Sequence, residues 1–316
     1  MSLKLLKDLF TPRLLLLALV LPLGCNKKPE IPATPAVQTF ASPDDAGNAL
    51  LAAAKSGDQN AVNAIFGPDS KDVINSGDPV EDKNAANAFV AGYSRMHRWR
   101  KLPDGAQILL VGAENFPFPI PLSKNAGGQW FFDTAAGKEE VLSRRVGRNE
   151  LAIIEVCAAA ATAQAEYFAH PHDGQPAKQY AAKFLSDPGK QNGLYWDAPA
   201  GQPQSPLGPL AAFATAEGYT ANPNAHAPFH GYYFHMLKGQ TAKAPGGAKQ
   251  YSVDGSMTGG FAFVAYPAVY GNSGVMTFSI NQDGVLLEKD LGKDTTTIAA
   301  AMNDFDPDPG WKIVLP

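Results

Sequence analysis

Residues 259–291 read GGFAFVAYPAVYGNSGVMTFSINQDGVLLEKDL, and the rest of the chain can be placed around them. Side chains alternate along residues 261–266 and again along residues 275–280, which is the period-two pattern of β-strands. Asp283-Gly284 makes a tight turn, and residues 285–287 begin a third run. Three antiparallel strands in so short a stretch form a meander. Its apolar face must be covered by another element.

A long helical pattern upstream provides that cover. From Lys138 onward, apolar residues recur at three- and four-residue spacing, which fits one face of a helix. The members of this face are Val141, Leu142, Val146, Leu151, Ile154, Cys157, Ala158, Ala161, Ala165 and Phe168. His170-Pro171 ends the helix, since proline cannot continue it. We expect the ridge from Leu151 to Phe168 to lie across the C-terminal sheet.

The segment before this helix predicts a further α+β region. Ser42-Pro43 and Asp78-Pro79 each combine a capping side chain with a proline suited to the first helical turn. Strand patterns follow at residues 107–111 and 129–133. We therefore expect the α+β class, with a helix-plus-antiparallel-sheet domain at residues 42–147 and a helix-on-antiparallel-sheet domain at residues 148–316.

Composition agrees with this class and excludes one function. The 316 residues include 26 prolines and 30 glycines, and only 18% are charged, which favours turns and antiparallel strands over a helical bundle. The formal net charge is -4, so the basic surface of a nucleic-acid-binding protein is not expected.

The first residues have the pattern of an export signal. Lys4, Lys7 and Arg13 precede an apolar run at residues 14–23, which is too short to span a membrane as a helix. The following Gly24-Cys25 resembles a bacterial lipobox, although Pro22 stands where leucine is preferred. We expect residues 1–25 to be a signal peptide, Cys25 to be lipidated, and the proline-rich residues 26–41 to be a tether. An ordinary cleaved signal with an incidental cysteine is the alternative.

The expected product is a periplasmic or membrane-anchored lipoprotein, held to the membrane through the lipid on Cys25. After export, Cys157 is the one remaining thiol of the sequence, so an internal disulfide is not expected. Because Cys157 lies among apolar residues at helical spacing, we interpret it as a buried structural thiol rather than a nucleophile.

Several short motifs carry a resemblance to a known family. They are RRVGRNELAIIEVCAAAATAQAEYF at residues 144–168, GLYW at 193–196, SPLGPL at 205–210, FHGYYFHML at 229–237, GGFAFVAYPAVYGNSGVMTF at 259–278 and FDPDPGW at 305–311. From about Phe40 onward the chain resembles a bacterial family of exported proteins catalogued as domain of unknown function 2950. The resemblance implies no activity for any residue.

A looser resemblance concerns the C-terminal half. A helix ending in AQAEYF, a long loop, GYYF and a strand hairpin are similar to the globular heads of type IV pilins and pseudopilins, in which a helix lies against an antiparallel sheet. The chain has neither their processing site nor their long apolar N-terminal helix. The resemblance therefore implies a pilin-like shape, and only the shape is carried over.

Two groups of residues are candidates for metal ligation. His170, His172 and Asp173 would need partners such as His226, His230 or His235. Asp304, Asp306 and Asp308 alternate as in the first half of a calcium loop, but Pro309 replaces the glycine and the distal glutamate is missing from the sequence. A helix-end turn and a proline-stiffened turn explain the two groups as well. We therefore expect no metal and no cofactor.

Aromatic residues give the candidates for ligand binding. The set is Tyr195, Trp196, His230, Tyr232 and Tyr266. These side chains can line a groove for a sugar or a peptide, because rings stack on the ligand and polar tips bond at the rim. The alternative is that they fill the core between the sheet and its loops.

The sequence favours binding over catalysis. It contains no nucleophile elbow, phosphate loop or HExxH pair, so no catalytic residue is expected. We expect a non-catalytic envelope protein that binds or scaffolds a protein or polysaccharide. The alternatives are a hydrolase of glycan or peptide using a carboxylate or histidine between residues 170 and 235, and an accessory component of a pilus or secretion system.

Overall fold

The computed structural model describes residues 37–174, 178–199, 201–221 and 227–314. The expected signal peptide, Cys25 and most of the expected tether lie outside these ranges. The described chain is an α+β fold, as the sequence predicts.

The C-terminal meander forms the centre of the largest core. Strands β9 (Ala262–Pro267), β10 (Met276–Asn281) and β11 (Leu287–Asp290) pair antiparallel in sequence order. Strand β6 (Tyr232–Met236) pairs with the other edge of β9, and β13 (Lys312–Ile313) pairs with β11. The sheet order is β13-β11-β10-β9-β6, so the three predicted strands are confirmed and two distant segments extend them.

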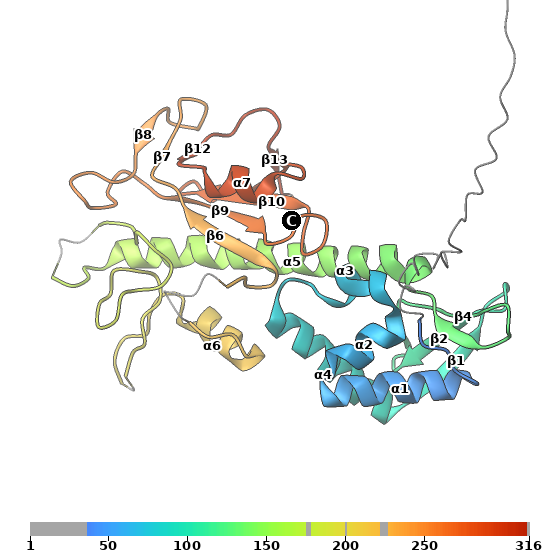
Figure 1. Ribbon diagram of the computed structural model, residues 1–316. Helices are drawn as coiled ribbons and strands as arrows, with labels where there is room; N and C mark the ends of the chain where they lie inside the picture. Colours follow the sequence, from blue (N-terminus) through green and yellow to red (C-terminus); the bar gives the residue numbers. More distant parts are fainter. Residues whose placement is uncertain (1–36, 175–177, 200, 222–226, 315–316) are drawn as a thin grey trace, which may run out of the picture. The chain divides into compact units, whose positions relative to one another are not determined.

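Both faces of this sheet are covered, because every residue of β9 is buried. The helix α5 (Thr134–Ala169) contacts β10, and α7 (Thr295–Ala300) contacts β9 (Figure 1). Ile153, Cys157 and Ala160 of α5 belong to the same buried cluster as Phe263 and Phe278, and Ala299 of α7 joins it as well. The predicted cover by the long helix is confirmed.

The buried face of α5 differs in phase from the predicted one. Leu151, Ala158 and Ala165 are exposed, with Leu151 at 67%. The buried positions are Gly137, Arg145, Asn149, Ile153, Val156, Cys157, Ala160, Ala163, Gln164 and Tyr167. Three of these side chains are polar, and each bonds to a segment distant in sequence. Cys157 is fully buried, as expected of a structural thiol.

The first part of the chain forms a second core of its own. Its elements are α1 (Pro43–Ser56), α2 (Gln59–Phe66), η1 (Pro68–Ser70), α3 (Lys71–Ile74), α4 (Pro79–Arg95), β1 (His97–Lys101), β2 (Gln107–Val111), β3 (Phe116–Pro117), β4 (Leu122–Lys124) and β5 (Trp130–Phe132). The sheet order is β1-β2-β4-β5, with β3 beside β2. Ser42 and Asp78 cap α1 and α4 as predicted.

The expected domain boundary between residues 147 and 148 falls inside α5, which continues without interruption from Thr134 to Ala169. Residues 35–316 form one compact unit. The division into one domain at residues 42–147 and another at residues 148–316 stays a prediction.

The remaining elements lie in the second half of the chain. They are α6 (Gly208–Glu217), β7 (Gly239–Gln240), β8 (Lys249–Gln250) and β12 (Asp304–Phe305). Strand β12 pairs parallel with β7, which pairs antiparallel with β8. Figure 1 shows α6 apart from the sheets, joined to the chain by long loops.

Of the helices in the described part of the chain, α5 alone is long and apolar enough to cross a membrane. Its length and composition are also those of a core helix. Because its inner face packs on the sheet, we interpret α5 as a core helix.

Candidate functional site

The last turns of α5 hold a long loop in place. Gln164 is fully buried and its amide pairs with the backbone of Ala181: Nε2 donates to the carbonyl and Oε1 accepts from the N–H, both at 2.9 Å. This pairing holds the loop that follows α5 at Ala181.

Tyr167, one turn further along α5, fixes the middle of the loop. Its hydroxyl donates to the carbonyl of Gln191 at 2.6 Å, and burial raises the pKa of Tyr167 to about 12. The imidazole of His172 stacks on the phenol ring at 3.8 Å and donates from Nε2 to the Tyr167 carbonyl at 3.0 Å. Asp173 accepts from the N–H of Gln191 at 2.7 Å.

These contacts position Trp196. Its indole packs edge-on against His172 at 5.5 Å and against Tyr167 at 6.5 Å. The preceding Tyr195 forms a bridge with Leu185, and Gly193 allows the two chain segments to approach closely. A Cβ atom on Gly193 would lie 2.6 Å from the backbone nitrogen of Ser186, so the approach requires glycine.

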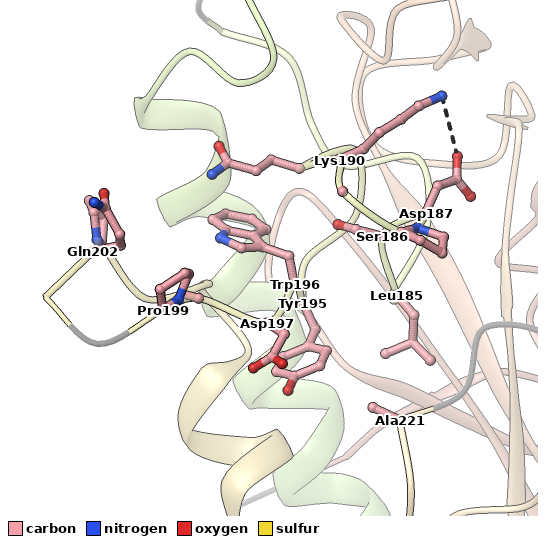
Figure 2. Close-up of a pocket in the computed structure, with 15 residues that line it drawn as sticks. Leu185, Ser186, Asp187, Lys190, Tyr195, Trp196, Asp197, Pro199, Gln202 and Ala221 are labelled. Atoms are coloured by element: carbon pink, nitrogen blue, oxygen red, sulfur yellow. Dashed lines mark ion pairs between the residues drawn. The ribbon is translucent and has the colours of Figure 1, made fainter.

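Trp196 and Tyr195 line a pocket of about 390 Å³, called here the tryptophan pocket (Figure 2). In this view the indole lies between Gln202 and the ion pair of Lys190 with Asp187. The polar residues of its lining are Ser186, Asp187, Lys190, Gln191, Asp197 and Gln202. An aromatic surface surrounded by amide, carboxylate and ammonium groups can both stack on a ligand and bond to its hydroxyls.

The carboxylate of Asp187 is held in its ionised form. Lys183 donates to it at 2.7 Å and Asn192 donates at 2.8 Å, and these hydrogen bonds lower the pKa of Asp187 below its ordinary value. The Nζ atom of Lys190 lies 3.9 Å from Oδ2 of this carboxylate. The pocket therefore presents an ionised acceptor, Asp187, beside the ammonium group of Lys190.

A second pocket of about 440 Å³, called here the apolar pocket, adjoins the first. The two pockets share Leu185, Tyr195 and Ala221 in their linings. The hydrophobic side chains that line only the apolar pocket include Val80, Val156, Phe184, Leu207, Leu210, Ala214, Phe229 and Phe234. They come from α4, α5, α6, β6 and the intervening loops.

One corner of the apolar pocket is polar but internally satisfied. Asp78 accepts from the N–H groups of Val80 and Glu81 with one oxygen, and from Tyr219 and the N–H of Gly231 with the other. Burial raises the pKa of Tyr219 far above its ordinary value, and the hydrogen bond to Asp78 adds to this rise. The buried carboxylate therefore has partners on both oxygens.

The structure separates the five candidates for ligand binding. Tyr195 and Trp196 line the tryptophan pocket. Tyr232 and Tyr266 are 0% and 3% exposed and belong to the sheet core, where the Tyr232 hydroxyl donates to the Met276 carbonyl. His230 lies beside Tyr219, with Nε2 at 3.1 Å from a carboxylate oxygen of Glu217 and a left-handed backbone at φ 48°.

The first group of metal candidates has other partners. His170 follows α5 and is exposed, and His172 and Asp173 hold the loop as described above. His235 donates to the Met302 carbonyl at 2.9 Å. His226 lies outside the described residues. Within the described ranges, no three His, Cys, Asp or Glu side chains are placed to hold a metal ion.

The second group, the C-terminal aspartates, also bonds within the protein. Asp306 accepts from Thr241 and Lys243, whereas Asp308 accepts from Lys289 and the N–H of Gly310. Asp304 lies in the short strand β12. The proline-stiffened turn thus accounts for the alternating carboxylates.

Sequence reasoning missed the residues that build the pockets from the side of α5. Gln164 and Tyr167 were not distinguished from other helical positions, because their partners are backbone atoms of a loop. The signal that was available is a glutamine and a tyrosine three residues apart on a helix rich in alanine.

Comparison with known proteins gives a family. The family model described as "Protein of unknown function (DUF2950)" matches residues 37–314. No curated protein and no solved structure matches the chain. The resemblance to pilin heads therefore stays a prediction.

Proposed function

Because the chain belongs to the DUF2950 family of proteins of unknown function, we propose a role for it from its own pockets: it is a non-catalytic, exported binding protein that recognises a saccharide of the cell envelope. The observation that carries the proposal is the tryptophan pocket, whose lining combines Trp196 with carboxylate, amide and ammonium side chains. A sugar ring has apolar faces that stack on an indole and hydroxyls that bond to carboxylate and amide oxygens.

The pocket's surroundings support binding by a preformed site. Trp196 is held by two edge-on aromatic contacts, and the loop that carries it is bonded to α5 at Ala181 and Gln191. A rigid site avoids part of the entropy cost of ordering on binding. The export signal and lipid anchor proposed for residues 1–25 would place this site in the envelope, where polysaccharides are found.

Titration calorimetry with envelope-type oligosaccharides and with peptides tests the proposal. We expect an oligosaccharide to bind and Trp196→Ala to reduce its affinity at least about fivefold, since an aromatic stacking contact contributes on the order of 1 kcal/mol or more. Phe116→Ala is the matched control, because Phe116 is an aromatic residue that is 61% exposed and outside the pocket. Binding of peptides alone, or equal effects of both variants, would contradict the proposal.

A second candidate function is hydrolysis of an envelope glycan. It is favoured by the partly buried pair of His230 and Glu217. His230 lies beside Tyr219, and Tyr219 itself lines the apolar pocket. A carboxylate that orients an imidazole is a common arrangement in general acid–base catalysis. Release of reducing ends from a glycan, lost in both His230→Ala and Glu217→Gln with the fold retained, would establish it. Turnover unaffected by either variant would exclude this pair.

A further inference from the structure

The apolar pocket is a hollow among the described residues beside α6, a helix that packs on a buried cluster through Leu210. One side of α6 contributes Leu210, Ala211, Ala214 and Thr215 to the lining, yet none of the residues of α6 is buried. The pocket is open to solvent on one side, and its volume of about 440 Å³ lies within the range of small-molecule binding sites.

The lining of this pocket selects an apolar occupant. Its one carboxylate, Asp78, already accepts four hydrogen bonds. A peptide backbone would lose water from its N–H and C=O groups and find few partners among these side chains, which costs free energy for each group. An alkyl chain has no such groups, and burying each methylene is favourable.

The two pockets are joined at Tyr195. This residue, with Leu185 and Ala221, lies in the linings of both. A polar ligand bound on Trp196 is thus directly beside the apolar space. At roughly 30 Å³ for a water-sized group, the apolar pocket has room for on the order of a dozen methylenes.

We propose that the two pockets hold one amphiphile, with its saccharide head on Trp196 and a single alkyl chain in the apolar pocket. This inference rests on the proposed saccharide-binding function and names its ligand class, a glycolipid. Tyr195 lies at the junction of head and chain.

Calorimetry of the full chain with alkyl glucosides tests this proposal. The probes are glucose and its hexyl, octyl, decyl and dodecyl glucosides, each kept below its micelle concentration. We expect affinity to rise with chain length, by up to roughly fourfold for each fully buried methylene, and then to level off when the pocket is full. An affinity independent of chain length, or no binding of any glucoside, overturns the inference.

A matched pair of variants locates the chain. Ala214→Phe fills the apolar pocket and is expected to abolish the gain with chain length. Ala212→Phe makes the same change on the exposed side of α6 and is expected to retain the gain. Thr215→Phe, at an exposed position that also lines the pocket, is a second blocking variant if Ala214→Phe does not fold. Equal behaviour of the blocking and control variants overturns the inference.

The same titrations separate this inference from the function on which it rests. Saccharide binding that is lost in Trp196→Ala, with no contribution from the alkyl chain, refutes the amphiphile and leaves saccharide recognition standing. Alkyl glucoside binding unchanged in Trp196→Ala refutes head recognition in the tryptophan pocket. Displacement of the dodecyl glucoside by an apolar peptide would assign the apolar pocket to a peptide instead.

Discussion

At position 164 of α5, a fully buried glutamine bonds through both ends of its amide to the backbone of Ala181. Replacing it leaves a buried N–H and a buried C=O without partners. Each such group costs about 1–3 kcal/mol. The consequence extends to the tryptophan pocket, since Ala181 lies in the loop that carries Trp196.

We predict that Gln164→Ala lowers the free energy of unfolding by about 3 kcal/mol. Thr162→Ala is the control on the same helix, where the side chain is exposed and the effect should stay within about 0.5 kcal/mol. Urea denaturation followed by circular dichroism measures both. Similar midpoints for the two variants would show that the Ala181 contact contributes little.

At this scale the sequence identifies the types of the site residues better than their positions. Tyr195 and Trp196 are adjacent in the sequence, so a prediction that one of them lines a pocket also brings the other close to that pocket. Tyr232 and Tyr266 have the same chemistry, but the face of the sheet to which each side chain points depends on what covers that face. Both belong to the buried core of the sheet, and only the tertiary structure supplies that information.

Among the elements, α5 contains two glycines in opposite environments. A Cβ atom on Gly137 would lie 2.7 Å from the Cα atom of Ile120, whereas one on Gly147 would meet nothing within 4 Å. Helical glycine is otherwise destabilising relative to alanine by about 0.5–1 kcal/mol.

We therefore predict opposite signs for the same substitution in one helix. Gly147→Ala should raise the free energy of unfolding by about 0.5–1 kcal/mol, and Gly137→Ala should lower it by at least about 1 kcal/mol, because the backbone around Ile120 must move. Thermal unfolding of the two variants gives the comparison. A stabilised Gly137→Ala would mean that α5 and the segment at Ile120 are less closely packed than described.

The segment containing β12 and β13 should respond to acid. Hydrogen bonds from Thr241 and Lys243 lower the pKa of Asp306, and the hydrogen bond from Lys289 lowers the pKa of Asp308. Because both folded-state values lie below the ordinary one of 3.8, the two groups stabilise the fold above about pH 4. This stability is lost as the pH falls further, through the folded-state pKa values.

We predict that the double variant Asp306→Asn/Asp308→Asn is less stable than the parent at pH 7, by under about 1 kcal/mol for each carboxylate, because both side chains are partly exposed. The difference should shrink as the pH is lowered from 7 to 2. Urea midpoints at the two pH values measure it, with Asp104→Asn as an exposed control. A difference that persists at low pH would show that ionisation is not its cause.

Element types could be predicted from local patterns, whereas the phase of α5 could not. The meander could be predicted from the sequence because strands β9, β10 and β11 are consecutive and joined by short connections. On α5, Arg145, Asn149 and Gln164 occupy the buried face that apolar residues were expected to hold. Arg145 donates to the Val73 carbonyl and Asn149 to that of Ser273, and such partners leave no periodic trace in sequence.

For the molecule as a whole, Asp78 joins the early helices to the second half of the chain. It caps α4 and also accepts from Tyr219 and Gly231. Asp58 caps α2 in the same manner, with partners that are local only. The two aspartates therefore separate the contribution of a cap from that of a long-range connection.

We predict that Asp78→Ala lowers the free energy of unfolding by about 3 kcal/mol and Asp58→Ala by about 1 kcal/mol. In a double-mutant cycle, Asp78→Ala and Tyr219→Phe should show a coupling of about 1–2 kcal/mol. Chemical denaturation supplies the four values. An additive cycle would reduce the role of Asp78 to that of a local cap.

The predicted leader also acts on the whole molecule. If Cys25 carries a lipid, Cys25→Ser should move the protein from the membrane fraction to a soluble fraction. The variant has no thiol to which the acyl chains can be attached, and it therefore loses their affinity for the bilayer. Cell fractionation and the mass of the N-terminal peptide measure this. Equal membrane association of parent and variant would contradict the anchor.

The order of strands in the C-terminal sheet also constrains when the protein can fold. Strand β9 lies at the centre of its core, but α7 and β13, which complete one face and one edge, are formed by residues 295–313. A nascent chain that has emerged only as far as β11 leaves one side of β9 open to water. The last steps of synthesis thus decide when the sheet closes, so the sheet cannot be completed before residues 295–313 have been made.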